Sequence, residues 1–278
     1  MKFTKMQGCG NDYVYINCFE ENVSNAKALA IQVSHRRFGV GSDGLILIKP
    51  TDQADAEMEM YNSDGSMSEM CGNGLRCVAK FVYDHGIVAK KEMNLLTGDG
   101  IKGVIVHPKK QDITKADALT IDMGLPKLEG SSIPSTFIGD KIVEQEISAG
   151  GKKFKATLIN MGNPHCVIFV DNAAEFPVEE YGPILENHEA FPARINIEFV
   201  EVVSPNEVIQ RTWERGSGET WACGTGASAV SVAGVLTGRT QSDVLIHLTG
   251  GDLQLQYTEG GPVIMTGPAV EVFTGQVN

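Results

Sequence analysis

Two cysteines, Cys71 and Cys223, occupy matching short segments of the chain, and both are candidates for proton-transfer chemistry. The segments read Met70-Cys71-Gly72-Asn73-Gly74 and Ala222-Cys223-Gly224-Thr225-Gly226. Each cysteine directly precedes a Gly-x-Gly turn, after which a run of small and apolar residues predicts a helix. A thiol at a helix start faces the positive end of the helix dipole, so we expect a lowered pKa and thiolate near neutral pH. A single cysteine there is more often an inert packing residue, and the repeated context is what favours a chemical role.

The surroundings of the two cysteines repeat as well. Cys71 and Cys223 are 152 positions apart, and the same spacing separates Asn11 from Asn163. The spacing also relates two further pairs, Asn62 with Glu214 and Gly44 with Asn196. A repeat this long indicates two copies of one ancestral domain, because the units of a solenoid are much shorter.

Two thiols on opposite sides of one carbon can invert its configuration. One thiolate removes a weakly acidic hydrogen, and the other thiol donates a proton from the opposite face. Backbone N–H groups at the helix starts would bind a substrate carboxylate and stabilise the negative charge that develops on it. Polar residues that repeat in both halves are candidates for holding the substrate: Asn11 and Asn163, Asn62 and Glu214, and Asn73 and Thr225. Arg215 is a candidate for a bidentate contact with a carboxylate, although a solvated surface arginine is an equally common reading.

Composition restricts the class of protein. The chain has 278 residues, 42% hydrophobic and 21% charged, with a formal net charge of −12. This length fits about two domains of roughly 150 residues. The negative charge argues against a nucleic-acid or anionic-membrane surface. No apolar run is long enough to span a membrane, and no signal-peptide core follows Met1, so we expect a cytoplasmic protein with reduced cysteines.

The elements that position the cysteines follow from hydrophobic periodicity and turn residues. Helices are predicted from the first cysteine segment to about His85 and from Gly224 to about Leu236, and a further helix from Ser24 to about Arg37. Short strands fill most of the remaining chain. The predicted domains are residues 1–116 with 267–278, and residues 117–266, with the active site in the cleft between them.

Seven segments together resemble diaminopimelate epimerase: Met6 to Asp12, Tyr61 to Gly65, Met70 to Gly74, Gly162 to His165, Asn196 to Phe199, Trp213 to Gly216 and Ala222 to Gly226. The resemblance implies an α/β (α+β) fold of two pseudosymmetric domains, each a mixed, mostly antiparallel sheet rolled around a central helix. It implies an isomerase that needs no cofactor and no metal. The implied reaction interconverts LL-2,6-diaminopimelate and meso-2,6-diaminopimelate, in lysine and peptidoglycan-precursor biosynthesis. The implied assembly is a homodimer.

The resemblance also assigns roles, residue by residue. Cys71 and Cys223 are the implied acid/base pair, and His165 and Glu214 are implied to tune the pKa values of the thiols. The implied substrate-binding residues are Asn11, Asn62, Gly72, Asn73, Asn163, Asn196, Glu214, Arg215, Gly224 and Thr225. The chain departs from some family members at Gly44, where those have a glutamine that glycine cannot replace as a side-chain contact.

Two alternatives remain at this point. A proline racemase or hydroxyproline epimerase would use the same cysteine pair on the same fold, but Glu214, Arg215 and the asparagines favour a long substrate with a polar far end. A thiol redox or metal-binding module is a remote alternative. Cys71 and Cys77 are six positions apart, and the chain contains no Cys-x-x-Cys motif.

Overall fold

A computed structural model describes residues 1–277, which divide into two compact units. The first contains Met1–Asp122 and the chain from Thr266 onward, and the second contains Met123–Met265. The division after Asp122 lies six residues beyond the expected position after residue 116. The reason is that β8 (Ala116–Asp122) pairs along its length with β7 (Gly100–Pro108) and so stays with the first unit.

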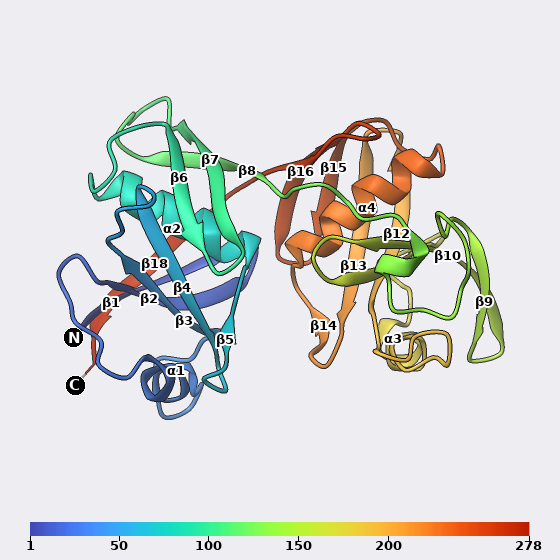
Figure 1. Cartoon of the computed structure of the whole chain (residues 1–278), viewed down its shortest axis with the longest axis horizontal. Coiled ribbons are helices and arrows are strands. Elements are labelled where there is room, and N and C mark those ends of the chain that lie inside the picture. The colour runs from blue at the N-terminus through green and yellow to red at the C-terminus, as the bar shows by residue number, and fades with distance from the viewer. Residues whose placement is uncertain (278) are drawn as a thin grey trace. The chain divides into compact units, whose positions relative to one another are not determined.

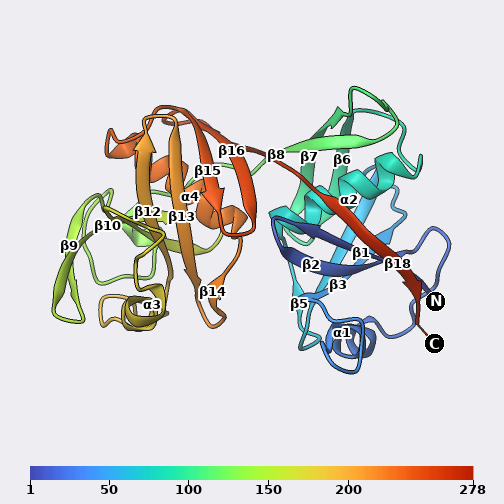
Figure 2. The ribbon, with the colours of Figure 1, turned by 180° about the vertical axis from the view of Figure 1, so that it is seen from behind.

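The first unit is one continuous strand ladder with two helices. Its strands pair in the order β18–β1–β2–β3–β4–β6–β7–β8, and the β2–β3 and β4–β6 pairs are parallel. The remaining bounds are β1 (Lys2–Gly8), β2 (Asn11–Asn17), α1 (Ala26–Ser34), β3 (Gly44–Lys49), β4 (Ala56–Asn62), β5 (Met67–Ser68), α2 (Gly72–Asp84), β6 (Glu92–Thr97) and β18 (Val270–Gln276). Figure 2 shows β18, the last strand of the chain, running beside β1.

The second unit repeats this arrangement. Its strands pair in the order β9–β10–β11–β12–β13–β15–β16, and the β11–β12 and β13–β15 pairs are parallel. The bounds are η1 (Gly130–Ser132), β9 (Gln145–Ala149), β10 (Lys152–Asn160), β11 (Pro164–Phe169), α3 (Val178–Glu186), β12 (Asn196–Ser204), β13 (Glu207–Glu214), β14 (Gly218–Thr220), α4 (Gly224–Leu236), β15 (Asp243–Leu248) and β16 (Gly251–Tyr257). The strand β17 (Val263–Gly267) then leads back into the first unit.

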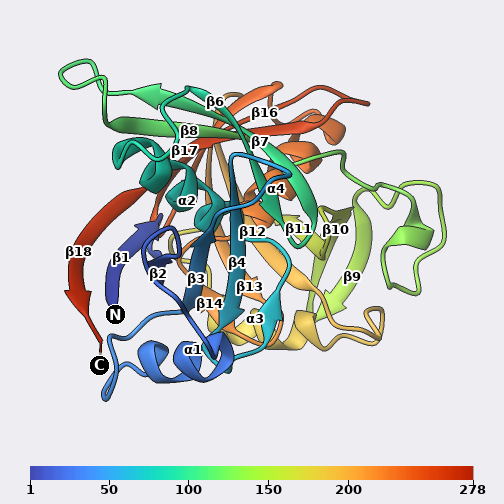
Figure 3. The same cartoon turned by 60° about the vertical axis from the view of Figure 1, so that its left-hand side comes forward.

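Each sheet curls around one helix. Helix α2 contacts strands from both ends of its ladder, including β18 and β8, and Figure 3 shows it beside β1 and β2. Helix α4 likewise contacts β10 and β16, near the two ends of the second ladder, and Figure 1 shows it lying along that sheet. An enclosed helix is buried nearly all round, which explains why α4 consists of glycine, alanine, serine, threonine, valine and leucine. The fold is therefore the expected mixed α/β architecture.

The two units match in strand register as well as in sequence spacing. Tyr13 lies opposite Gly44 in the parallel β2–β3 pair, and His165 lies opposite Asn196 in the parallel β11–β12 pair. These partners are related by the same 152-residue spacing that relates the cysteines. The duplication therefore holds at the level of individual backbone positions.

Helix ends follow local hydrogen bonding. Helices α2 and α4 each end before a glycine with a positive φ, Gly86 at 68° and Gly238 at 68°, as C-terminal caps require. The prediction for α1 was too long at both ends. The Asn25 side chain, not Ser24, caps the helix by accepting the Ala28 N–H at 3.0 Å, and His35 is already extended. No helix within residues 1–277 is long and apolar enough to cross a membrane.

Candidate active site

Cys71 is the N-cap residue of α2. Its backbone is extended (φ −144°, ψ 114°), and its Sγ accepts the Gly74 N–H at 3.4 Å. The Sγ atom also lies 3.3 Å from Asn11 Oδ1, which brings together two residues 60 positions apart in the sequence. The Cys71 thiol therefore lies among polar groups, in the first turn of the helix, where backbone N–H groups lack acceptors within the helix.

The two asparagines beside Cys71 are held in place by charged groups. The Asn11 amide donates to Asp43 Oδ2 at 2.8 Å, and the Asn73 amide donates to Asn11 Oδ1 at 3.5 Å. The fully buried guanidinium of Arg76 donates to Asn73 Oδ1 at 2.8 Å and to the Pro268 carbonyl at 3.1 Å. Sequence reasoning missed Arg76 and Asp43, because nothing in their local sequence distinguishes them from surface charges.

Asn62, another predicted residue of the first unit, hydrogen-bonds to a residue outside the group around Cys71. Its amide donates to Ser66 Oγ at 3.0 Å within the turn from β4 to β5. The remaining predicted residue of this unit, Gly72, is the first residue of α2 and is buried.

Cys223 has the same place in the second unit. It caps α4 with an extended backbone (φ −123°, ψ 109°), and its Sγ accepts the Gly226 N–H at 3.4 Å. The Thr225 hydroxyl lies 3.4 Å from the same sulfur atom. Gly224, a predicted substrate-binding residue, begins the helix and is buried.

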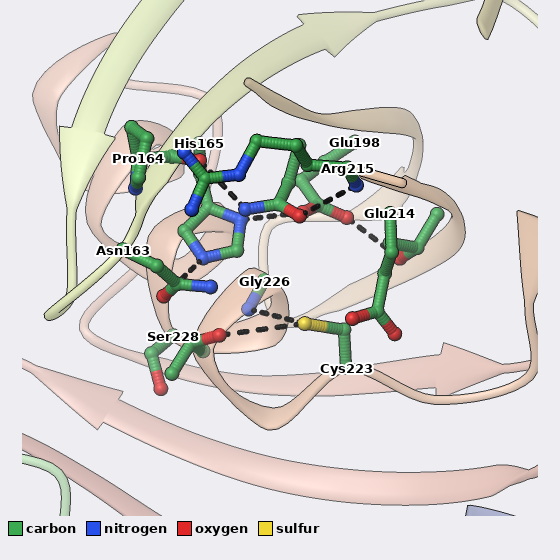
Figure 4. A network of polar contacts seen from close by, with 12 residues as sticks. Asn163, Pro164, His165, Glu198, Glu214, Arg215, Cys223, Gly226 and Ser228 are labelled. Carbon is green, nitrogen blue, oxygen red and sulfur yellow. Dashed lines mark hydrogen bonds and ion pairs between the residues drawn. The ribbon is translucent and has the colours of Figure 1, made fainter. Parts of the chain in front are cut away.

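His165 and Glu198 form a buried pair near Cys223. His165 Nδ1 lies 2.7 Å from Glu198 Oε1, and His165 Nε2 lies 3.0 Å from Asn163 Oδ1 (Figure 4). Both the imidazole and the carboxylate are fully buried. Their ligand-type atoms and Cys223 Sγ all lie within 4.8 Å of one another. The structure therefore brings the predicted residues Asn163, His165 and Cys223 into one cluster.

The expectation of a lowered thiol pKa was wrong for Cys223. Burial raises the pKa of the Cys223 thiol well above its ordinary value, and the negative charges of Glu214 and Glu198 raise it further. The hydrogen bonds from Thr225 and Gly226 lower it, but they do not offset burial and the two carboxylates. Cys223 is therefore protonated near neutral pH in this environment.

The other thiols with shifted pKa values fit packing roles. Burial raises the pKa of Cys77 to about 12, and burial together with the Glu198 charge raises the pKa of Cys166. Burial also raises the pKa of Cys18. Thiols of this kind stay protonated and unreactive at neutral pH.

The segment that carries Glu214 and Arg215 is held by hydrogen bonds with the side chains of Asn196 and Thr220. The Asn196 side chain accepts the Arg215 N–H at 2.9 Å and donates to the Pro164 carbonyl at 2.8 Å. The Thr220 hydroxyl donates to Glu214 Oε1 at 2.6 Å. Arg215 Nη1 donates to the Ala193 carbonyl at 3.2 Å, and this contact is exposed. Figure 4 shows Glu214 near Cys223 and Arg215 on the side of His165.

A second brace comes from α3. The Glu186 carboxylate is 5% exposed and accepts the Trp213 indole N–H at 2.7 Å and the Gly216 N–H at 2.9 Å. These donors flank Glu214 and Arg215 on both sides in the sequence. Sequence reasoning missed Glu186, although a carboxylate at the end of a helix is unfavourable there and so could have pointed to a specific partner.

His165, Glu198 and Cys223 are also residue types that bind metal ions. The 2.7 Å separation of His165 Nδ1 from Glu198 Oε1 is a hydrogen-bond distance. Two ligand atoms of a tetrahedral zinc site lie about 3.3 Å apart at the usual bond lengths. Both Glu198 oxygens already accept hydrogen bonds, from His165 on one side and from Gln210 and Thr212 on the other. The spacing therefore fits a hydrogen-bonded network better than a metal centre.

Glu198 is the main residue of the second unit that sequence reasoning missed. Its only local signal is a glutamate between two large apolar residues, Ile197 and Phe199, in a predicted strand. A charge at such a position is rarely tolerated without a partner.

Comparison with solved structures defines the class. A hydroxyproline epimerase from Agrobacterium vitis, with bound trans-4-OH-L-proline, aligns with a TM-score of 0.66 at 14% identity, covering 100% of this chain and 90% of that one. A PhzF-family phenazine biosynthesis protein of Bacillus anthracis aligns with a TM-score of 0.71 at 13% identity, covering 100% and 99%. Identities this low show the fold alone. The chain therefore shares its fold with these two proteins, one of which is a hydroxyproline epimerase.

Sequence comparison narrows the class to one family. The model of the family described as diaminopimelate epimerase matches residues 3–128 and 157–272. A diaminopimelate epimerase of Agathobacter rectalis is 50% identical over 286 aligned residues, covering 100% of this chain and 99% of its own. Those of Leptospira biflexa and Methanococcus maripaludis are 49% and 45% identical, each over 100% of this chain and 99% and 100% of their own. The chain belongs to the diaminopimelate epimerase family, which is a family of isomerases.

Proposed function

We propose that this protein interconverts LL-2,6-diaminopimelate and meso-2,6-diaminopimelate by a two-cysteine proton transfer. The observation that carries the proposal is the pair of thiols, Cys71 and Cys223, each capping the first turn of the matching helix in a duplicated fold. Family membership supports the choice of substrate. The proposed setting is the cytoplasm, where thiols stay reduced, in lysine and peptidoglycan-precursor biosynthesis.

In the proposed mechanism the two thiols act from opposite faces of the substrate α-carbon. One cysteine, as thiolate, takes the α-proton, and the other, as thiol, donates its proton to the opposite face. The electron pair left by the departing proton spreads into the carboxylate and returns to the carbon when the second proton arrives. Backbone N–H groups at the starts of α2 and α4 stabilise the charge on that carboxylate. The raised pKa of Cys223 suits a proton donor.

The remaining site residues hold the substrate. The amide groups of Asn11, Asn73 and Asn163 lie beside the cysteines and the imidazole, where they can bind the reacting amino-acid end. Glu214 and Arg215 present opposite charges, as the ammonium and carboxylate groups of an amino acid require. We also assign substrate contacts to Asn62 and Asn196 and to the helix-start residues Gly72, Gly224 and Thr225.

An assay of the purified protein with LL-diaminopimelate, without added cofactor, tests the function. The expected result is conversion to the meso form, with one deuterium at the inverted carbon when the reaction runs in D₂O. Parallel assays with L-proline and trans-4-hydroxy-L-proline distinguish the alternative substrates. Epimerisation of a proline substrate, with none of diaminopimelate, would contradict the proposal.

Arg215→Met should lower kcat/KM for diaminopimelate by about tenfold to a hundredfold. A charge-assisted bidentate contact is worth about 1.5–3 kcal/mol, which corresponds to this range. The guanidinium makes an exposed contact to the Ala193 carbonyl, so folding should be unaffected. Steady-state kinetics checks the effect, with Arg37→Met, at an exposed position after α1, as the matched control. Unchanged kinetic constants would make Arg215 a surface residue.

We also propose that two copies of the chain form a dimer through β18. This strand pairs with β1, and its side chains Val270, Val272 and Phe273 are 43%, 55% and 49% exposed. Exposed apolar side chains on a strand favour pairing with a second sheet, and an isologous contact places the same strand on both sides.

Val272→Lys should shift the protein from dimer to monomer. The substitution puts a like charge from each copy into the proposed contact, and the apolar area it removes is already exposed within one chain. Sedimentation equilibrium at several concentrations measures the mass. Ile138→Lys is the control, because Ile138 is a fully exposed apolar residue in the second unit. A dimer that persists in Val272→Lys, or a wild-type monomer, would exclude this contact.

A further inference from the structure

Near Cys223, four polar side chains form one buried hydrogen-bond network. His165, Glu198, Gln210 and Thr212 are each at most 1% exposed. Glu198 Oε1 faces His165 Nδ1 at 2.7 Å, as Figure 4 shows. Glu198 Oε2 accepts the Gln210 amide at 2.9 Å and the Thr212 hydroxyl at 2.6 Å. The carboxylate is thus held by donors on both of its oxygens, and one of them is the imidazole ring.

The duplicated first unit builds the same strands without this network. Glu198 lies opposite Thr212 in the β12–β13 pair, and Ile46 lies opposite Met60 in the β3–β4 pair. These partners are related by the 152-residue spacing. The four positions equivalent to His165, Glu198, Gln210 and Thr212 are Tyr13, Ile46, Met58 and Met60, and all four are buried. One half of the protein therefore replaces an entire polar network with apolar and aromatic side chains.

The same substitution is visible at the helix starts. A Cβ atom added to Gly74 would meet Ile46 Cδ1 at 2.8 Å, whereas one added to the equivalent Gly226 would meet Glu198 Oε1 at 2.5 Å. The first turn of α4 therefore packs directly against a carboxylate, and the first turn of α2 packs against a methyl group.

The difference between the two units shows which buried side chains the fold requires. Removing a carboxylate and an imidazole from water is unfavourable, even when they are paired. The first unit forms the same ladders and the same capped helix without that expense in free energy. The network of the second unit is therefore not needed to build the fold, and it lies beside only one of the two proposed acid/base cysteines.

We propose that Glu198 is a positioning residue for the epimerisation and acts through His165. By accepting the hydrogen bond from Nδ1–H, Glu198 fixes the orientation of the imidazole ring. The ring in turn contacts Asn163 through Nε2 at 3.0 Å and lies within 4.8 Å of the Cys223 sulfur. Glu198 thus holds a substrate-binding amide and the surroundings of one thiol without touching the substrate. The proposal rests on the proposed function, because it assigns Cys223 to proton transfer.

A double-mutant cycle with Glu198→Gln and His165→Asn tests this role. Glu198→Gln should lower kcat about tenfold to a hundredfold, the size seen when a partner that orients a functional histidine is lost. In the His165→Asn background the same change should alter kcat by less than about twofold, since the group through which Glu198 acts is already gone. Full activity of Glu198→Gln overturns the proposal. So does an equal loss in both backgrounds, because Glu198 would then act independently of His165.

A control variant and a spectroscopic measurement distinguish a failure of this proposal from misfolding of a variant and from failure of the proposed function. Glu201→Gln is the matched control: Glu201 lies on the same strand, accepts the Ala173 N–H at 2.9 Å and should leave kcat unchanged. Nitrogen-15 spectra of histidine-labelled wild-type protein should show a proton on His165 Nδ1, with the signal assigned by its absence in His165→Asn. An unprotonated Nδ1 overturns the proposal even if Glu198→Gln does not fold. The spectra report on the His165–Glu198 hydrogen bond even if the protein shows no epimerase activity. Failure of the proposed function can therefore be told apart from failure of this proposal.

Discussion

Cys71→Ala and Cys223→Ala should each lower kcat/KM for epimerisation by about a thousandfold or more. Each variant lacks one of the two groups that must accept and donate a proton in the same turnover, and a positioned acid or base contributes about 10² to 10⁴ in rate. The fold should survive. Each sulfur accepts one capping hydrogen bond, 3.4 Å long, from a backbone N–H. Losing an N-cap side chain lowers the free energy of unfolding by about 1 kcal/mol.

Chiral separation of the reaction products measures the loss, and thermal unfolding checks that each variant is folded. Serine at either position should leave at most weak activity, because a hydroxyl is a far weaker acid than a thiol at neutral pH. Cys18→Ser is the control, since Cys18 is half-buried on the edge of the first-unit core and lies outside the site. Full activity in either alanine variant would remove that cysteine from the mechanism.

The helices that carry the cysteines were predictable because their signals are local. Helix α4 begins at Gly224 and ends at Leu236 as predicted, and α2 ends within one residue of the predicted His85. Each helix start is marked by a residue able to cap it and the glycines that follow, and each helix end by a glycine two positions beyond its last residue. Sequence spacing alone also related the strands of one unit to those of the other.

Electrostatics at the thiols was not predictable in the same way. The prediction of a lowered pKa considered the helix dipole, which acts within one turn of the chain. The dominant effects at Cys223 are burial and two carboxylates, and the nearest of those in the sequence, Glu214, precedes it by nine positions. Burial depends on how a whole sheet packs around the helix, and no short segment carries that information.

Side chains that act on other side chains were the least visible in the sequence. Glu198 and Arg76 each hold a residue that was predicted, and Glu186 holds Trp213 and Gly216, which flank the predicted Glu214 and Arg215; none of the three was predicted itself. The partners of Glu198, Glu186 and Arg76 lie 33, 27 and 3 positions away. The first contact joins the paired strands β11 and β12, the second joins α3 to β13, and the third lies within α2. A motif identifies the groups that meet the substrate, whereas their supports become visible only when the strands are placed side by side.

Glu214→Gln should lower the pKa of the Cys223 thiol and speed its alkylation at neutral pH. After burial, the Glu214 charge is the largest cause of the raised pKa, and glutamine removes this charge while still accepting the Thr220 hydroxyl bond. Only the thiolate reacts with iodoacetamide. If the pKa falls by about one unit, the thiolate fraction and the alkylation rate rise about tenfold at a pH below the pKa.

The measurement is the rate of iodoacetamide labelling of the Cys223 peptide as a function of pH, followed by mass spectrometry. The midpoint of the rate should move to lower pH in Glu214→Gln, while Glu201→Gln should leave it in place. Epimerisation should fall in the same variant, because a substrate-binding charge is lost. A generally loosened site would also lower the pKa of the thiol by exposing it, so the thermal unfolding midpoint of Glu214→Gln is measured as well and should match that of the wild type. A midpoint that stays in place or rises would mean that Glu214 does not control this thiol, and its part in the mechanism would then be confined to binding.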